Sequence, residues 1–168
     1  MPIEFNYPGT PKYALYLDDC RNPLGSVTIN VGTPLDPVQM ETLPWAVPRS
    51  YDEFVQVLTE RGMPAFISFD HDLDEEHMKE YFAMKDNGDV IIDYDKFEVK
   101  TGLDCCKYMV DMALSMNQIP AAINLHTHNS YGLKNMKEYL KSVLPRVRIT
   151  TDRLPFEWVP ELLPASLK

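Results

Sequence analysis

Three short apolar runs constrain the fold of this chain most strongly, because each run ends abruptly in ionisable side chains. Each run has the length and composition of a buried β-strand. The runs are YALYL at residues 13–17 before Asp18 and Asp19, AFISF at residues 65–69 before Asp70, His71 and Asp72, and AAINL at residues 121–125 before His126, Thr127 and His128. A buried strand ordinarily leads into Gly, Asn or Pro turn residues, so these polar ends indicate a functional site.

Helical patterns separate and follow these runs. Ser50 with Glu53 three residues later is typical of a helix N-cap, and Gly62 predicts the end of that helix. Thr101 is a plausible cap for a second helix, whose apolar face we expect to point to the core. The apolar residues at helical spacing are Leu103, Cys106, Met109, Val110, Ala113 and Leu114 in the second helix, and Leu133, Met136, Leu140 and Val143 in a third.

Strands that alternate with helices predict a parallel sheet with right-handed crossovers and helices on both faces. Residues 45–47 and 146–150 are expected to add two more strands, the second of them half-exposed. The chain is therefore expected to be a three-layer α/β protein with a five-stranded sheet. Its 168 residues suffice for one core but are few for two, so we expect residues 1–168 to form a single domain.

Two segments interrupt this alternation and are interpreted as loop insertions. Residues 25–44 are rich in Gly, Pro and Thr. Residues 74–100 are acidic and contain two possible strands, at 90–92 and 97–99, which predict a β-hairpin. His77 and the charged residues 74–80 are interpreted as a solvated face, and the tail from Pro155 is expected to pack back on the body.

Composition narrows the class of partner. The net charge of -9 disfavours a long nucleic-acid polymer, because phosphate chains would be repelled, while a small phosphorylated ligand remains compatible with local cations. No apolar run approaches the roughly 20 residues of a membrane helix, and no secretory pattern opens the sequence, so no membrane partner and a cytoplasmic location are expected. Three cysteines suit reduced core thiols. The oligomeric state is left open.

The polar strand ends are expected to converge, because ligands of open parallel sheets bind at the carboxyl ends of the strands. Several carboxylates in one place raise each other's pKa unless a cation compensates for their charge. Oxygen ligands suit a hard divalent ion, so Asp18, Asp19 and Asp70 are predicted to hold Mg²⁺, with Mn²⁺ or Zn²⁺ as alternatives. Asp18 and Asp19 could instead be ordinary loop or capping residues.

The remaining candidates suit acid-base chemistry and phosphate binding. An imidazole titrates near neutral pH, so His126 and His128 are candidate proton donors or acceptors, and His71 with Asp72 could supply or orient a second such group. Arg21 could hold a phosphate with its planar fork or simply pair with the neighbouring acids. Two further candidates begin the third helix, Asn129 and Ser130, either as phosphate ligands or as plain caps.

The arrangement of acids resembles that of receiver domains, in which two acids after the first strand and one after the third hold magnesium. The lysine followed by proline that a signalling receiver carries at its fifth strand is absent here, where the sequence reads TTDRLP at residues 150–155. A closer resemblance is to the cyclic-phosphate-processing receiver-like domains of bacteria and phages. It is carried by LYLDDCRNP at residues 15–23, FISFDHDL at 66–73, TGLDCCKYMV at 101–110 and IPAAINLHTHNSYG at 119–132.

The family pattern for the third strand end is His-Ser-x-Asn-Pro-x-Gly. This sequence agrees at His126, Asn129 and Gly132 and departs from the pattern with Thr127 and Ser130. The resemblance implies a receiver-like (flavodoxin-like) fold and the processing of cyclic phosphates on nucleotides or RNA ends, in a bacterial cell or in the host of a phage. The predicted activity is therefore a metal-dependent phosphoesterase. The alternatives are a non-catalytic protein that sequesters a nucleotide or phosphorylated ligand, and a degenerate receiver used for protein contacts.

Overall fold

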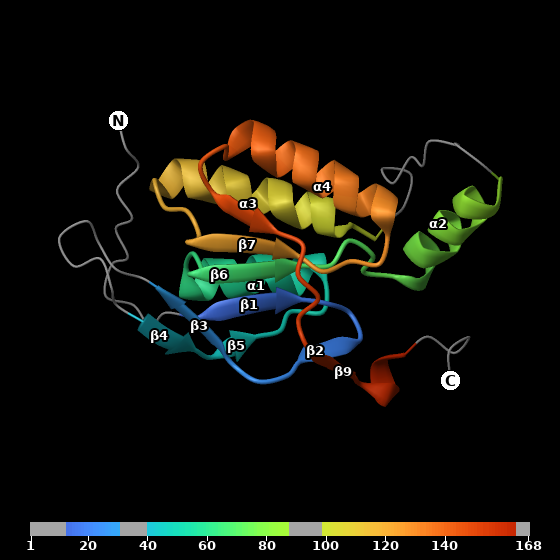
Figure 1. Ribbon diagram of the computed structural model, residues 1–168, viewed down its shortest axis with the longest axis horizontal. Helices are drawn as coiled ribbons and strands as arrows, with labels where there is room; N and C mark the ends of the chain where they lie inside the picture. The colour runs from blue at the N-terminus through green and yellow to red at the C-terminus, as the bar shows by residue number, and fades with distance from the viewer. Residues whose placement is uncertain (1–12, 31–39, 88–98, 164–168) are drawn as a thin grey trace.

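A computed structural model describes residues 13–30, 40–87 and 99–163. Its centre is a five-stranded parallel sheet in the order β5-β1-β6-β7-β8 (Figure 1). The strands are β1 (Ala14–Leu17), β5 (Trp45–Ala46), β6 (Phe66–Phe69), β7 (Ala122–Leu125) and β8 (Arg148–Thr150). Counted along the chain, this is the order 2-1-3-4-5 of flavodoxin-like sheets. The predicted receiver-like α/β class is confirmed.

The described residues form four α-helices, of which the first, third and fourth begin and end largely where the sequence predicts, while the second lies in a segment predicted to be a loop insertion. They are α1 (Tyr51–Arg61), α2 (Glu75–Asn87), α3 (Gly102–Met116) and α4 (Ser130–Val143). The hydroxyl of Ser50 accepts a hydrogen bond from the backbone N of Glu53, and Gly62 ends α1 with a φ of 79°. Thr101 caps α3 in a capping box with Asp104. Asn129 caps α4 by accepting a hydrogen bond from the backbone N of Gly132.

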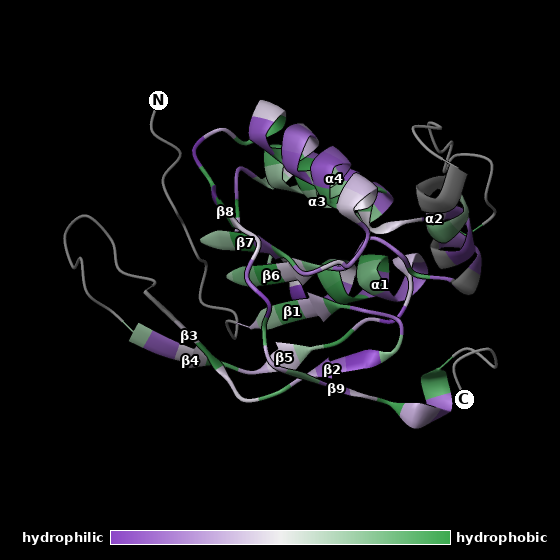
Figure 2. Cartoon of the chain, turned by 45° about the vertical axis from the view of Figure 1, so that its right-hand side comes forward, coloured by the Kyte–Doolittle hydropathy of each residue, from purple (hydrophilic) through white to green (hydrophobic). Residues whose placement is uncertain are grey.

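The main core lies between the sheet and the helices α1, α3 and α4. Alternate residues of each strand point to this side. The core residues of the strands are Leu15, Leu17, Ile67, Phe69, Ile123 and Leu125, and they pack against Phe54, Leu58, Met109, Val110, Met136 and Leu140 of the helices. Figure 2 shows hydrophobic residues gathered in β6 and β7 and hydrophilic residues on the outward side of α4. Leu114 departs from the predicted core face of α3, because its side chain is 63% exposed.

The sequence predicted helices on both faces of the sheet, but within the described residues the helices that pack against it, α1, α3 and α4, all lie on one face. The three crossovers from β5 to β6, β7 and β8 all step in one direction across the sheet, so right-handed connections place α1, α3 and α4 on the same side. The step from β1 to β5 runs the other way. Its described part contains an antiparallel strand pair, β3 (Val27–Asn30) and β4 (Met40–Leu43), and Leu43 packs with Ala14 and Phe66 on the opposite face.

The two predicted loop insertions therefore contain regular structure. Residues 25–44 include the pair β3 and β4. Residues 74–100 begin with α2, which lies beyond the carboxyl ends of the strands at the right of Figure 1. The hairpin predicted at 90–99 falls mostly on residues 88–98, outside the described ranges. Within those ranges, no helix combines the length and the apolar character needed to cross a membrane.

The tail from Pro155 packs back on the body, as predicted. Strand β9 (Phe156–Trp158) pairs antiparallel with β2 (Arg21–Pro23), and a short 3₁₀ helix, η2 (Pro160–Leu162), follows it. This pairing brings the end of the chain against the loop that leaves β1 (Figure 1). Two residues more than 130 positions apart thus become neighbours, because Arg21 lies opposite Trp158 in the register.

Candidate active site

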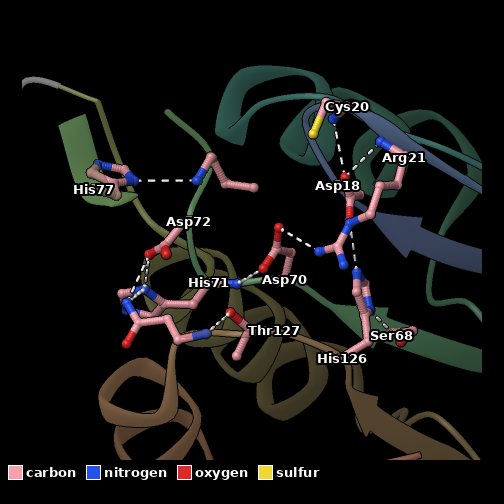
Figure 3. A network of polar contacts seen from close by, with 12 residues as sticks. Asp18, Cys20, Arg21, Ser68, Asp70, His71, Asp72, His77, His126 and Thr127 are labelled. Atoms are coloured by element: carbon pink, nitrogen blue, oxygen red, sulfur yellow. Dashed lines mark hydrogen bonds and ion pairs between the residues drawn. The ribbon is translucent and has the colours of Figure 1, made fainter. Parts of the chain in front are cut away.

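The site lies where the sheet order reverses, at the carboxyl ends of the adjacent strands β1 and β6. The chain leaves these two strands toward different parts of the sheet, and ligands of such folds bind at this point. Strand β1 delivers Asp18 and β6 delivers Asp70, while the next strand, β7, delivers His126 (Figure 3). The predicted convergence of three strand ends is therefore present.

Asp18 is fully buried and accepts four hydrogen bonds. Its Oδ1 accepts from the backbone N of Cys20 at 3.0 Å and of Arg21 at 2.7 Å. Its Oδ2 accepts from Nε of Arg21 at 2.6 Å and from Nε2 of His126 at 3.0 Å. These bonds use all the acceptor positions of a carboxylate. Burial alone would raise the pKa of Asp18, but the bond from His126 and the charge of Arg21 outweigh burial and lower it, so Asp18 is ionised.

Arg21 joins the two buried carboxylates. Besides its bond to Asp18, its guanidinium donates from Nη2 to Oδ2 of Asp70 at 3.1 Å. The side chain is only 4% exposed, and its Cζ lies 5.0 Å from the ring centre of Phe156 and 5.6 Å from that of Trp158. Of the two roles predicted for Arg21, the structure shows the pairing with the acids.

Asp70 accepts fewer hydrogen bonds than Asp18. Its Oδ1 accepts from the backbone N of His71 at 2.8 Å, and its Oδ2 accepts from Arg21 alone among the described contacts. Burial and the nearby charge of Asp18 raise the pKa of Asp70. Asp19 is half-buried, and burial together with Asp70 and Asp18 raises its pKa to about 7. At Asp70, burial and the charge of Asp18 therefore outweigh the charge of Arg21, which acts to lower the pKa.

His126 is held by three contacts. Its Nδ1 lies 2.7 Å from Oγ of Ser68, its Nε2 lies 3.0 Å from Oδ2 of Asp18, and its ring stacks on Tyr16 with centres 4.2 Å apart and planes at 8°. Because an ionised Asp18 only accepts, Nε2 carries a proton. The order carboxylate, imidazole, hydroxyl does not make Ser68 a nucleophile, because Ser68 is fully buried.

Asn124 positions Ser68 from the neighbouring strand. Its Nδ2 donates to Oγ of Ser68 at 3.0 Å and to the backbone O of Asp152 at 3.0 Å. Its Oδ1 accepts from Oγ1 of Thr150 at 2.7 Å and from the backbone N of Asp152 at 2.8 Å. All hydrogen-bonding positions of this amide are used. Sequence reasoning missed Ser68 and Asn124, although each is a polar residue inside an apolar strand, which is the signal that could have found them.

His71, Asp72 and Asn129 form a second cluster beside the first. Nδ1 of His71 lies 2.7 Å from Oδ1 of Asp72, and the same oxygen accepts from Nδ2 of Asn129 at 2.9 Å. His71 is fully buried, Asp72 is 7% exposed and Asn129 is 1% exposed. Because Asn129 also caps α4, this cluster ties the end of β6 to the start of α4.

Two glycines allow this close packing. A Cβ on Gly132 would lie 2.3 Å from Cγ of His71, and a Cβ on Gly102 would lie 1.8 Å from the backbone O of Asp70. Both distances are far shorter than any contact between a carbon atom and an atom to which it is not bonded. The first turns of α3 and α4 can therefore approach the end of β6 only because these positions lack a side chain.

The other predicted residues lie at the edge of the site. His128 is exposed, and burial of part of its ring and the charge of Arg21 lower its pKa. Ser130 is also exposed, and its Oγ lies 2.9 Å from the hydroxyl of Tyr81 in α2. Asn129 and Ser130 thus act as cap and first residue of α4.

His77 was interpreted as part of a solvated face, and this is wrong. Its side chain is fully buried, its Nδ1 accepts from the backbone N of Leu73 at 3.2 Å, and its Nε2 donates to the backbone O of Val99 at 2.8 Å. The ring therefore joins two stretches of backbone. The reason is local, because the first turn of α2 places residue 77 back over the chain that leaves β6.

Arg49 also belongs to the site and was missed from the sequence. Its Nη1 donates to the backbone O of Asp18 at 3.2 Å and of Arg21 at 2.7 Å, and its Nη2 donates to Oδ1 of Asn22. Arg49 thus fixes the loop that leaves β1. It directly precedes the cap of α1, and nothing in the sequence sets it apart from a surface arginine.

The donor set is compatible with a divalent cation. One ligand atom each from Asp18, Asp70 and His126 lies within 4.8 Å of the other two, which suits a small ion with metal–oxygen distances of roughly 2.1 Å. Asp18 can join an ion only if Arg21 or His126 releases it, since its acceptor positions are used. Asp19 and Asp70 retain raised pKa values, which a nearby cation would lower.

The fold and the site define a receiver-like α/β protein with acids and a histidine gathered at its switch point. Over residues 13–142 the sequence matches the family described as cyclic-phosphate processing receiver domain. The chain belongs to this family. The matched span contains both polar clusters and ends within α4. No curated protein and no solved structure matched the chain.

Proposed function

We propose that the protein is a metal-dependent phosphoesterase that hydrolyses a cyclic phosphate or a related phosphodiester of a nucleotide or RNA end. The observation that carries this proposal is the placement of Nε2 of His126 3.0 Å from Asp18, beside the guanidinium that joins Asp18 to Asp70. A proton donor, a fixed positive group and carboxylates for a cation are the parts that phosphoester hydrolysis needs. Membership of the family supports the class of substrate.

His126 is proposed as the proton donor to the leaving oxygen. Its Nε2 proton faces the carboxylates, and a substrate oxygen that approaches Nε2 competes with Asp18 for it. The hydroxyl of Ser68 can accept a hydrogen bond from Nδ1 as well as donate one, so it does not oppose this role.

Arg21 and the acids are proposed to bind the phosphate and the cation. The guanidinium would stabilise charge that develops on the phosphoryl oxygens. Asp18, Asp19 and Asp70 would hold Mg²⁺ or Mn²⁺. Ligand atoms of Asp18 lie within 4.8 Å of one on Asp70 and of one on Asp19, so Asp18 is the acid that the other two share. The ion would polarise a phosphoryl oxygen and lower the pKa of a bound water. His71, Asp72 and Asn129 hold the start of α4 in place.

A substrate panel tests the proposal. The protein is incubated with Mg²⁺ or Mn²⁺ and with cyclic mononucleotides, cyclic dinucleotides or RNA that ends in a cyclic phosphate, and the products are resolved by chromatography. We expect at least one cyclic phosphate to be opened to a monoester. Ligand that is retained but returned unchanged on denaturation would show a binding protein instead of an enzyme.

Asp70→Asn should abolish this turnover, and it can be compared with a matched control variant. Asparagine has the shape of aspartate and its amide oxygen can still accept from the backbone N of His71, so the amide should preserve the fold while removing a cation ligand. Asp74→Asn is the control, because Asp74 lies just beyond the site and its Oδ1 accepts from the backbone N of Glu76, as an amide oxygen also can. Equal turnover by both variants and the wild type would show that Asp70 is not part of the site.

A further inference from the structure

An exposed tryptophan lies against the proposed phosphate-binding arginine. Trp158 of β9 is directly opposite Arg21 of β2 in the antiparallel register, so the two side chains lie on the same face of this strand pair. The Cζ of Arg21 lies 5.6 Å from the indole centre. Although Arg21 is 4% exposed, Trp158 is 49% exposed, so the indole extends from the buried site toward solvent.

Backbone and ring contacts hold this indole in a fixed place. The backbone N of Val159 donates to O of Cys20 at 2.9 Å, and the backbone N of Leu24 donates to O of Pro155 at 2.8 Å, so β9 is anchored at both ends. The ring of Phe156 packs edge-on against Trp158, with centres 5.3 Å apart and planes at 89°. The fixed backbone and the contact with Phe156 reduce the freedom that the ring would lose on binding a ligand.

A large, rigid and half-exposed aromatic ring beside a cationic group suits one kind of ligand. Nucleobases stack on such rings whatever their sequence, because every base has a flat π-face. The stacked base is uncharged, so the protein's net charge of -9 does not oppose it. The cyclic phosphate attached to the same nucleoside would then lie toward Arg21, on the inner side of the indole.

We propose that Trp158 is a stacking platform for the nucleobase of the ligand whose phosphate binds beside Arg21. The inference rests on the proposed function and sharpens it, since the substrate becomes a nucleoside phosphate and not a sugar or lipid phosphate. Trp158 is a specificity-determining residue in this account. Removing its ring weakens nucleotide binding roughly tenfold or more, the usual effect of losing one base–aromatic stack.

Tryptophan fluorescence reports on this platform directly. The chain has two tryptophans, Trp45 and Trp158, so Trp45→Phe leaves Trp158 as the single emitter. That variant is titrated with adenosine 2′,3′-cyclic phosphate, adenosine monophosphate and ribose 5-phosphate, in EDTA to prevent turnover. We expect quenching by both adenosine compounds and little or none by ribose 5-phosphate. Equal quenching by all three, or none by the nucleotides, overturns the proposal.

Variants separate stacking from folding and from the proposed function. In binding assays Trp158→Ala should lose affinity for the adenosine compounds roughly tenfold, while Trp158→Phe retains most of it. Leu162→Ala, at another exposed apolar residue of the same tail, should change nothing. Thermal melting checks that β9 still pairs with β2. Unaltered nucleotide affinity in a folded Trp158→Ala variant overturns the platform.

The two proposals fail in different ways. If turnover is real, Trp158→Ala should raise KM for a cyclic nucleotide and leave kcat nearly unchanged, because the ring touches the base and not the reacting phosphate. Turnover with an unchanged KM in Trp158→Ala would contradict the stacking role of Trp158 and support the phosphoesterase activity. Nucleotide-dependent quenching without turnover of any cyclic phosphate would support the stacking role and contradict the phosphoesterase activity.

Discussion

Asp18 and His126 are 108 positions apart in the chain, yet Oδ2 of Asp18 lies 3.0 Å from Nε2 of His126. The contact spans two strand ends with β6 between them. Both residues are shielded from solvent, because Asp18 is fully buried and His126 is 8% exposed. The fold thus holds a proton-bearing imidazole nitrogen at an ionised carboxylate.

His126→Ala should abolish most activity, while His128→Ala should retain it. Loss of a positioned acid or base typically lowers kcat about 10²- to 10⁴-fold. His128 is exposed at the edge of the site, so we expect less than a tenfold effect there. Steady-state kinetics on the same cyclic phosphate compares the two. A larger loss in the His128 variant would show that the roles are reversed.

Ser68→Ala should disturb the imidazole of His126 on the side opposite Asp18. The change removes the partner of Nδ1 of His126 and leaves Nδ2 of Asn124 with one acceptor fewer, a buried loss that costs about 1 to 3 kcal/mol. In ¹⁵N NMR the wild-type ring should show a protonated Nε2 and an accepting Nδ1 at high pH. Ser142→Ala on the exposed face of α4 is the control and should stay within about 0.5 kcal/mol. Equal melting of the two variants would count against this network.

Arg21→Gln should destabilise the protein and make it responsive to Mg²⁺. Removing one partner of a buried ion pair costs about 3 to 5 kcal/mol, because Asp18 and Asp70 then face each other without their shared cation. Their freed oxygens become available to a metal ion. Thermal melting with and without millimolar Mg²⁺ should therefore show a larger upward shift for the variant than for the wild type.

The control for this experiment is Arg61→Gln. Arg61 lies over the ring of Tyr13, away from the carboxylates, so its loss should not create a Mg²⁺-dependent shift. If Mg²⁺ raises the melting temperature of none of the three proteins, no divalent site lies between these acids, and the metal-dependent part of the proposal is wrong.

Gly132→Ala should destabilise the protein, against the usual effect of alanine in a helix. Alanine ordinarily improves a helix position by about 0.5 to 1 kcal/mol. Here its Cβ would collide with the His71 ring, so we expect a loss of about 1 to 3 kcal/mol. Chemical denaturation measures the change, with Lys134→Ala on the exposed side of α4 as a near-neutral control. A stabilising Gly132→Ala would mean that α4 does not pack this closely.

Sequence patterns predict the sheet well, because each strand and its polar end are local. The runs ending at Leu17, Phe69 and Leu125 are neighbouring parallel strands of one sheet. The side of the sheet that each helix covers depends instead on the direction of every step across it. The step from β1 to β5 contains β3 and β4, which local patterns had suggested to be a loop.

The residues that support the site were harder to predict, because their partners are distant in the sequence. Asn124 is held against Ser68 by Thr150 of the next strand and by Asp152 just beyond it, and Arg49 contacts the loop after β1. His77 was misjudged because its acidic neighbours suggested a solvated face, whereas its ring joins Leu73 to Val99. Such contacts between distant backbone groups leave no spacing signal in a single sequence.

The most direct test of the account is a ³¹P NMR time course of a nucleoside 2′,3′-cyclic phosphate with the protein and Mg²⁺. We predict that the cyclic phosphodiester resonance declines while a monoester resonance grows, and that Asp70→Asn and His126→Ala each stop this change. A cyclic resonance that persists unchanged, in the presence of protein shown to bind the nucleotide, would contradict the account and identify the site as a binding site.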